Sequence, residues 1–272
     1  MTLNLKGALM DLGVPKVMGI LNVTPDSFYP SSRTFEEDKI RERAAKLIEE
    51  GADIIDIGGC STRPGYQIPS LEEELHRINL GCRLMKEINE NIPLSIDTFR
   101  PEVASMAIDI WKADIINDIS GGDKPMFEII AKNHVIYILT HNPGEENKND
   151  YKDVTAETIM WLSWKLHELH KLGVNDVIID PGFGFSKNTE ENYRLFNEID
   201  EIKRMGFPLL VGISRKSMIY KILGTTPEES LTGTIALNAI ALEKGADILR
   251  VHDVKEAKET LMIFQQIKGS RI

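Results

Sequence analysis

Short apolar runs alternate with longer amphipathic stretches along the whole 272-residue chain. Most of the apolar runs are continuous rather than alternating, a pattern typical of parallel strands that are covered on both faces. We therefore predict eight strands, at residues 16–23, 53–58, 93–97, 114–119, 134–139, 176–180, 209–213 and 247–251.

The stretches between these strands have the spacing of amphipathic helices. Ile40, Ala44 and Leu47, for example, recur at i, i+4 and i+7 and so share one helix face. Several helices pass into the next strand through a glycine, such as Gly51 or Gly245, which suits the left-handed conformation at a helix C-cap. Each predicted strand is therefore followed by a helix.

Eight strand–helix units in a chain of this length favour a single (β/α)8 TIM barrel, which typically needs about 250 residues. A doubly wound open sheet is the alternative arrangement of the same units. Because no Pro/Ser-rich linker or shift in composition divides the chain, we predict one domain over residues 1–272.

Composition excludes several classes of protein. The chain has 32 Lys and Arg against 42 Asp and Glu, a net charge of −10, which argues against nucleic-acid binding. Its two cysteines, Cys60 and Cys82, form neither a disulfide framework nor a run with zinc spacing, and Cys82 falls on a helix stripe that we expect in the core. The chain shows no secretory signal and no apolar run of roughly 18 residues, so we expect a cytoplasmic protein that does not enter a membrane.

In a TIM barrel the active site lies at the carboxyl ends of the strands. Polar or charged residues follow every predicted strand, whereas the opposite strand ends carry ordinary cap residues. The strand-end set is Asn22, residues 58–65, Asp97, Asn117, Asp118, residues 140–142, residues 180–185, residues 214–217, Arg250 and His252.

Some members of this set also have simple structural interpretations. Asp97 fits a cap of the following helix, and Asn22 fits a turn. Lys187, just beyond the set, fits a solvated residue at a helix start. Asp180 is different because it ends the apolar run VIID and should be partly buried, where a carboxylate needs a partner such as a ligand.

The cationic residues after the last two strands indicate the kind of ligand. Arg250 and His252 alternate along a strand and so point to the same side, and Lys216 follows the neighbouring strand. Buried cations without counter-charges are costly. We therefore predict a cationic cluster that binds an anion, such as a phosphate or pyrophosphate.

Seven motifs resemble those of bacterial dihydropteroate synthase, in the same order and over nearly the whole chain. They are MGILNVTPDSF (18–28), DIGGCSTRPG (56–65), SIDTFRPEVA (95–104), INDISGG (116–122), DPGFGFSKN (180–188), GISRKS (212–217) and RVHDV (250–254). The sequence departs from the family pattern in the first loop, at Cys60, where many members have Glu, and at Thr140, in place of a Met.

The resemblance implies a (β/α)8 barrel that makes 7,8-dihydropteroate and pyrophosphate from 6-hydroxymethyl-7,8-dihydropterin diphosphate and p-aminobenzoate. This is a step of folate biosynthesis and the target of sulfonamides. The resemblance also implies Mg²⁺ as cofactor and a cytoplasmic homodimer. The implied mechanism is an SN1-like substitution without a protein nucleophile, with an associative displacement left open.

The resemblance also assigns roles to residues of this chain. The implied catalytic residues are Asp97, Lys216, Arg250 and His252. The implied ligands of the pterin diphosphate are Asn22, Thr62, Arg63, Asp97, Asn117, Asp180, Lys216, Arg250 and His252. The implied contacts of p-aminobenzoate are Thr62, Pro64, Phe185 and Ser217, and Asn22 is the implied Mg²⁺ ligand.

Two other functions fit the same barrel. A pterin-binding methyltransferase that uses methyl-tetrahydrofolate would share the Asn and Asp residues for the pterin, but it would not need the STRPG and SRKS segments. A catalytically silent barrel that only binds its ligand is the second alternative. The charged groups at the strand ends favour an enzyme over such a binding protein.

Overall fold

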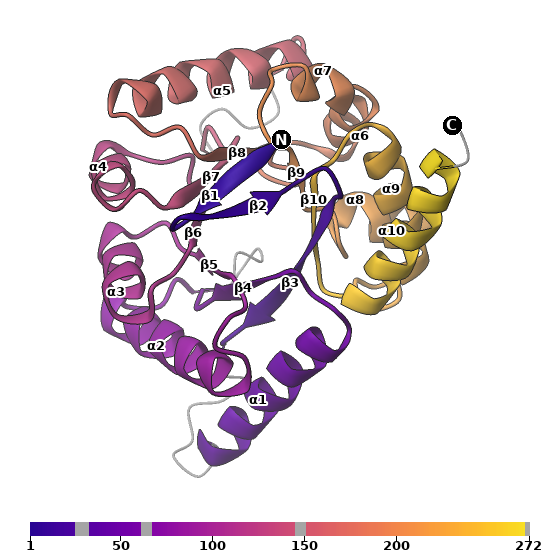
Figure 1. The fold of residues 1–272 in the computed structure, drawn as a ribbon. Helices are drawn as coiled ribbons and strands as arrows, with labels where there is room; N and C mark the ends of the chain where they lie inside the picture. The colour runs from indigo at the N-terminus through magenta and orange to yellow at the C-terminus, as the bar shows by residue number, and fades with distance from the viewer. Residues whose placement is uncertain (25–32, 61–66, 145–150, 270–272) are drawn as a thin grey trace.

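The computed structural model describes residues 1–24, 33–60, 67–144 and 151–269, and for residues 33–36 it describes the backbone alone. The eight predicted strands are present and lie in one parallel sheet at the centre of the molecule (Figure 1). They are β3 (Lys16–Asn22), β4 (Ile54–Gly58), β5 (Leu94–Asp97), β6 (Ile115–Asp118), β7 (Ile136–Thr140), β8 (Val177–Asp180), β9 (Leu210–Val211) and β10 (Ile248–Val251).

The sheet curls into a nearly closed barrel. Its strand order is β8-β7-β6-β5-β4-β3-β10-β9, and an isolated parallel bridge between Ile179 and Leu209 connects the two edge strands. The predicted TIM barrel is therefore confirmed, and the doubly wound open sheet is wrong.

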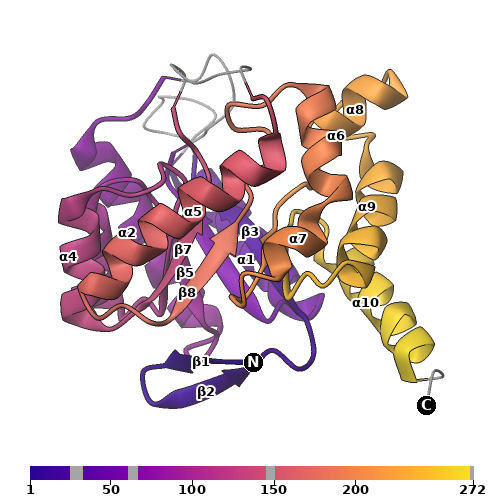
Figure 2. The ribbon, with the colours of Figure 1, turned by 90° about the horizontal axis from the view of Figure 1, so that it is seen from above.

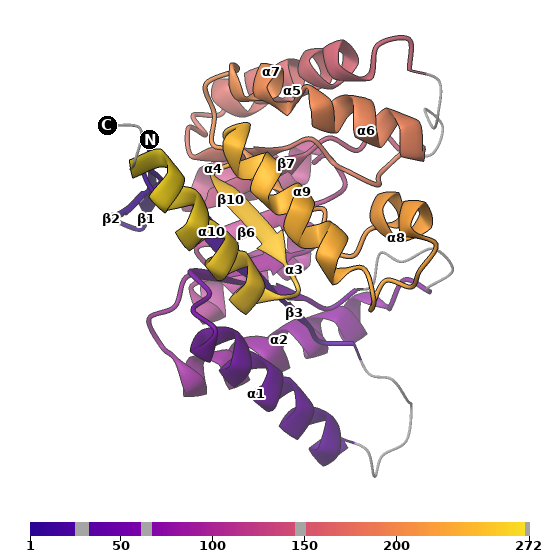
Figure 3. The same cartoon turned by 90° about the vertical axis from the view of Figure 1, so that its right-hand side faces the viewer.

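Helices follow every barrel strand and surround the barrel, with α9 and α10 side by side on its outer wall (Figure 3). Two helices, rather than one, follow each of β8 and β9. The helices are α1 (Arg33–Glu49), α2 (Leu71–Ile88), α3 (Pro101–Trp111), α4 (Lys124–Asn133), α5 (Val154–Lys171), α6 (Thr189–Asn197), α7 (Ile199–Lys203), α8 (Ser217–Leu223), α9 (Leu231–Glu243) and α10 (Val254–Gly269).

Alternate residues of the strands face two separate apolar cores. Val17 and Ile55 belong to the core between the barrel and the helices, and Cys82 of α2 is buried there, as predicted. Their sequence neighbours Met18 and Ile54 point the other way and belong to the core inside the barrel. This alternation explains the continuous apolar runs, because both faces of each strand are covered.

A two-stranded antiparallel hairpin that the sequence analysis did not predict precedes the barrel. It consists of β1 (Thr2–Leu5) and β2 (Ala8–Asp11), joined at Lys6 and Gly7, which both have positive φ, of 49° and 96°. Its Leu3 and Met10 pack into the core inside the barrel. The hairpin therefore covers the end of the barrel at which the strands begin, opposite the end at which they terminate (Figure 2).

In the described ranges, no helix combines the length and the apolar character that crossing a membrane requires.

Candidate active site

Three polar residues and a glycine from four neighbouring strands lie in register where those strands terminate, an end that we call the barrel mouth. Asn22 of β3 is paired with Gly58 of β4, Gly58 with Asp97 of β5, and Asp97 with Asn117 of β6. A Cβ atom at Gly58 would lie 3.6 Å from both Asn22 Oδ1 and Asp97 Cβ. The glycine therefore leaves an open space between two predicted ligand-binding groups.

Arg250 of β10 reaches across β3 and β4 to two carboxylates. Its Nε donates to Asp56 Oδ2 and its Nη2 donates to Asp97 Oδ2, each at 2.6 Å. Asp56 Oδ2 also accepts from Asn117 Nδ2 at 3.0 Å. One buried carboxylate thus orients two predicted ligand-binding side chains.

Asp56 is a site residue that the sequence analysis missed. Its side chain is fully buried at the centre of β4, in the apolar run IIDIG. A lone carboxylate in a buried run was the available signal, because such a group needs a charged or hydrogen-bonding partner. The rule that strand ends carry the chemistry does not reach a residue in the middle of a strand.

The close pairing of charges changes how these groups ionise. Burial, with a further contribution from Asp56, raises the pKa of Asp97 to about 7, although Arg250 opposes this shift. Burial disfavours the guanidinium of Arg250, but Asp56 and Asp97 more than offset it, so the pKa of Arg250 is raised. Arg250 therefore stays charged, whereas its partner Asp97 gains or loses a proton near neutral pH.

The predicted anion site stays a prediction, but two of its three cationic residues carry less free charge than the sequence suggests. Arg250 is paired with two carboxylates. Burial, together with the charges of Arg250 and Arg215, lowers the pKa of His252 to about 3, so its imidazole is neutral. Lys216 keeps a cation at the mouth, although burial lowers its pKa to about 8.

Asp180 and Lys216 both bind the glycine-rich segment that follows β8. Asp180 Oδ1 accepts from the Gly182 amide at 2.8 Å, and Lys216 Nζ donates to the carbonyl of Phe183. Burial raises the pKa of Asp180, whereas Lys216 lowers it. The ring of Phe185 lies beside the same ammonium, with its centroid 4.8 Å from Lys216 Nζ.

Two of the simple structural interpretations fail. Asp97 does not cap a helix, because α3 begins at Pro101 and its N-cap is Arg100. Lys187 is not solvated, because it is 7% exposed and hydrogen-bonded inside the protein. Asn188, by contrast, caps α6 in a capping box with Glu191.

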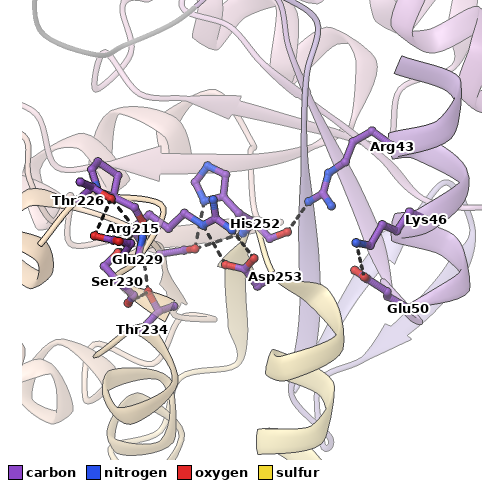
Figure 4. A network of polar contacts seen from close by, with 12 residues as sticks. Arg43, Lys46, Glu50, Arg215, Thr226, Glu229, Ser230, Thr234, His252 and Asp253 are labelled. Atoms are coloured by element: carbon purple, nitrogen blue, oxygen red, sulfur yellow. Dashed lines mark hydrogen bonds and ion pairs between the residues drawn. The ribbon is translucent and has the colours of Figure 1, made fainter. Parts of the chain in front are cut away.

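The segments after β9 and β10 are joined by side chains near the predicted anion site (Figure 4). Arg215 Nε donates to Asp253 Oδ2 at 3.0 Å, and Ser214 Oγ lies 3.0 Å from His252 Nδ1. Arg43 of α1 donates to the main-chain carbonyl of His252. These contacts fix the backbone on which Lys216, Arg250 and His252 are placed.

Three predicted site residues, Thr62, Arg63 and Pro64, lie outside the described residues, so their roles stay predictions. Ser217 is the first residue of α8, directly after Lys216. The side chain of Thr140 is buried at the end of β7, paired in register with Asp180.

The barrel mouth therefore combines acceptors and donors suited to one planar heterocycle. Asp97 and Asp180 supply carboxylate oxygens, Asn117 an amide, and Lys216 and Arg250 cationic donors. A ring with adjacent N–H donors on one edge and acceptor atoms elsewhere complements such a set. The fold and the site define a TIM-barrel enzyme that binds its ligand where the strands terminate.

Comparison with known proteins identifies the family. Residues 18–252 match the family described as pterin binding enzyme, and the chain belongs to this family. A dihydropteroate synthase of Clostridium beijerinckii is 42% identical over 245 residues, which cover 88% of this chain and 89% of that protein.

Solved structures agree with this assignment. A dihydropteroate synthase of Xanthomonas albilineans with 4-aminobenzoic acid superimposes with a TM-score of 0.90 at 36% identity, over 98% of both chains. A dihydropteroate synthase of Yersinia pestis in a sulfonamide drug complex has a TM-score of 0.90 at 35% identity, over 99% of this chain and 100% of that one.

Proposed function

We propose that the chain is a transferase that condenses 6-hydroxymethyl-7,8-dihydropterin diphosphate with p-aminobenzoate, giving 7,8-dihydropteroate and pyrophosphate. The observation that carries this proposal is the set of pterin-complementary groups at one barrel mouth, above all Asp180, Asn117 and Lys216. The relatives described above support it.

The pterin ring presents a 2-amino-pyrimidinone edge with neighbouring N–H donors. We assign Asp180 to this edge, because a carboxylate has lone pairs left after accepting one bond from Gly182. Asn117 is fixed by Asp56 and bonds another ring atom, while Lys216 donates to the ring's acceptor atoms. Arg250 stacks on the ring face and keeps its charge close to the diphosphate.

The chemistry needs no protein nucleophile. The C–O bond between the methylene group and the diphosphate breaks, its electron pair leaves with pyrophosphate, and the pterin spreads the positive charge. Ionised Asp97 stabilises that cation, and Arg250, Arg63 and a hydrogen bond from His252 stabilise the leaving group. The amine of p-aminobenzoate then attacks the methylene carbon and releases a proton.

Asn22 fits a Mg²⁺ site of limited protein ligation. No group of three acidic, His or Cys ligands occurs within the described part of the chain. Mg²⁺ commonly keeps several waters and takes one or two protein oxygens together with substrate phosphates. The amide oxygen of exposed Asn22, across Gly58 from Asp97, provides such a ligand. Bound Mg²⁺ would neutralise charge on the leaving diphosphate.

p-Aminobenzoate would bind on the outer side of the pterin. We assign Ser217 to its carboxylate, and Phe185, Thr62 and Pro64 to the walls around its ring. The half-buried ring of Phe185 lies beside the ammonium of Lys216 at the mouth, which supports this placement. Sulfonamides, which resemble p-aminobenzoate, would compete for the same position.

We further propose a cytoplasmic homodimer. Exposed apolar side chains occur on neighbouring helices of the outer wall, where a second copy would cover them. They are Ile222 and Leu223 of α8, Ile240 of α9, and Met262, Ile263 and Ile267 of α10. Sedimentation equilibrium of the purified chain tests this proposal, and a monomer at micromolar concentration would contradict it.

Turnover of the purified protein tests the function. With pterin diphosphate, p-aminobenzoate and Mg²⁺, we expect equal amounts of pyrophosphate and dihydropteroate. Methyl transfer from methyl-tetrahydrofolate instead would favour the methyltransferase, and tight binding without turnover would favour a silent barrel. Positional isotope exchange in the diphosphate without p-aminobenzoate tests the dissociative step, and its absence would count against that step.

A further inference from the structure

Lys187 is buried beside the pterin site with all of its hydrogen-bonding capacity used. Its Nζ donates to the carbonyls of Gly182 at 3.1 Å and Phe185 at 3.2 Å, and lies 2.9 Å from His141 Nδ1. An ammonium has three N–H donors and no acceptor, so it matches three acceptors in this arrangement. Among the described residues, no carboxylate forms an ion pair with Lys187.

His141 is held as a neutral acceptor for this ammonium. It is 1% exposed, and burial together with the charge of Lys187 lowers its pKa to about 2. Its ring packs edge-on against Trp161, with centroids 5.1 Å apart, and Thr158 Oγ1 lies 3.4 Å from Nδ1. The ring orientation is therefore fixed by α5, the helix that carries Thr158 and Trp161.

The two carbonyls that Lys187 binds belong to the segment that shapes the pterin site. Within this segment the Gly182 amide donates to Asp180, the Phe185 amide donates to the Gly182 carbonyl at 3.1 Å, and Phe183 accepts from Lys216. Gly182 has φ +69°, and a Cβ there would lie 2.0 Å from the carbonyl oxygen of His141. The turn therefore packs closely against the backbone of His141, and the hydrogen bonds from Lys187 hold it there.

We propose that Lys187 and His141 form a positioning pair that sets the 180–185 turn, and through it the carboxylate of Asp180 and the ammonium of Lys216, for recognition of the pterin ring. Neither residue touches the substrate in this role. The inference rests on the proposed pterin-binding function of Asp180 and Lys216, and it adds two residues to which no ligand contact is assigned.

Charge reinforces the geometry. Three charged groups face Lys187: Asp180 of β8, Lys216 at the start of α8 and Glu191 of α6. Burial lowers the pKa of Lys187 to about 7, and the negative charge of Asp180 opposes this shift. Lys187 in turn helps to lower the pKa of Asp180, which burial raises. An ammonium behind Asp180 therefore favours the ionised carboxylate that the pterin N–H donors require.

Lys187→Met tests the positioning pair when binding of the pterin ring and binding of the diphosphate are measured separately. We measure the Kd of 6-hydroxymethylpterin, which probes the ring site, and the Kd of inorganic pyrophosphate, which probes the anion site. Loss of hydrogen bonds from a buried charge predicts a pterin Kd raised about 10-fold or more, with the pyrophosphate Kd changed less than about 3-fold. An unchanged pterin Kd overturns the proposal.

Lys203→Met is the matched control. Lys203 also donates to a carbonyl, that of Phe207, and to Asp247, but it lies where strands β9 and β10 begin, away from the mouth. We expect this variant to lower the urea midpoint without changing the pterin Kd. An equal rise in the pterin Kd for Lys203→Met would show that general destabilisation explains the effect, and would overturn the proposal.

His141 keeps the proposal testable if Lys187→Met does not fold. His141→Asn places an amide oxygen near the position of Nδ1, whereas His141→Leu removes the acceptor. We expect Leu to weaken pterin binding about 10-fold and Asn to stay within about 3-fold of wild type. Equal effects of the two variants overturn the role of the acceptor. Failure of the wild type to bind the pterin at all would instead contradict the proposed function.

Discussion

Arg250 and Asp97 form an ion pair at 2.6 Å although 153 residues separate them in the sequence. They belong to β10 and β5, with β3 and β4 between them in the barrel. Arg250 reaches Asp97 at the level of Gly58, a residue of β4 that has no side chain. The ion pair therefore connects, at the mouth, two strands that are separated by two others in the sheet.

Gly58→Ala should impair the pterin diphosphate site without unfolding the protein. The added methyl would lie 3.6 Å from Asn22 Oδ1 and 3.8 Å from Asp97 Oδ2, which are ordinary contact distances. We expect the free energy of unfolding to change by less than about 1 kcal/mol. The KM for the pterin diphosphate should rise about 10-fold, because the methyl fills the space between two binding groups. Steady-state kinetics and urea unfolding check both values, and a normal KM would contradict the assigned position.

Asp56→Ala should cost stability because Asp56 is the acceptor for two buried donors. Its removal leaves Arg250 Nε and Asn117 Nδ2 without that oxygen, a loss of about 3–5 kcal/mol when a buried ion pair is broken. Glu190→Ala is the control, since Glu190 pairs with Arg194 on the exposed side of α6 and should cost at most about 1 kcal/mol. Urea unfolding of both variants measures the difference, and equal losses would argue against the buried pair.

Asp97→Asn should change how stability depends on pH. The pKa of Asp97 is raised from 3.8 to about 7 in the folded protein, so between these values the folded state holds a proton that the unfolded state has lost. Stability from this group is thus lost as pH rises through that window. Relative to wild type, the free energy of unfolding of the variant should rise by about 2–3 kcal/mol between about pH 5 and about pH 8. Urea unfolding at both pH values checks this, and parallel curves would contradict the raised pKa.

Lys216→Ala should weaken pterin binding. The variant loses the only cation assigned to the ring's acceptor atoms and the bond to the Phe183 carbonyl. A charged hydrogen bond of this kind predicts a Kd for 6-hydroxymethylpterin raised about 10-fold or more. Lys221→Ala, at an exposed position of α8, the helix that follows Lys216, serves as control and should bind normally. Near-normal binding by Lys216→Ala, measured by calorimetry, would remove Lys216 from the site.

Asn22→Ala should raise the Mg²⁺ concentration needed for half-maximal turnover. Chelation of Mg²⁺ should abolish turnover of the wild type, because the proposed role of Mg²⁺ is to neutralise charge on the leaving diphosphate. Asn22→Asp keeps an oxygen ligand and should need less Mg²⁺ than Asn22→Ala. Metal titrations of initial rates compare the three proteins. Turnover that resists chelation would contradict the proposed cofactor.

The barrel strands were predictable because their burial on both faces produces apolar runs that are visible locally. The hairpin was not, because β1 and β2 have four residues each and their turn is Lys6-Gly7 rather than the more typical Asn-Gly. Its apolar residues, such as Leu3, find their partners in the core inside the barrel, far away in sequence.

The position of the site was predictable, but its charge balance was not. Residues such as Asp97 and Asp180 follow from the rule that strand ends carry the chemistry. The neutralisation of Arg250 depends on Asp56, 194 residues away, and the neutral state of His252 depends on burial. Lys187 looked solvated because a sequence does not show which carbonyls will surround an ammonium.

The hairpin that covers the start of the barrel strands has a consequence for the order of assembly. During synthesis β1 and β2 are made before any barrel strand, yet the amide of Asn4 donates to the side chain of Asp176, which is 172 residues later in the sequence. Leu3 and Met10 also pack with Ile248 of the last strand. The hairpin therefore cannot complete its packing before the last barrel strand has been synthesised, and until then its apolar residues lack part of their core.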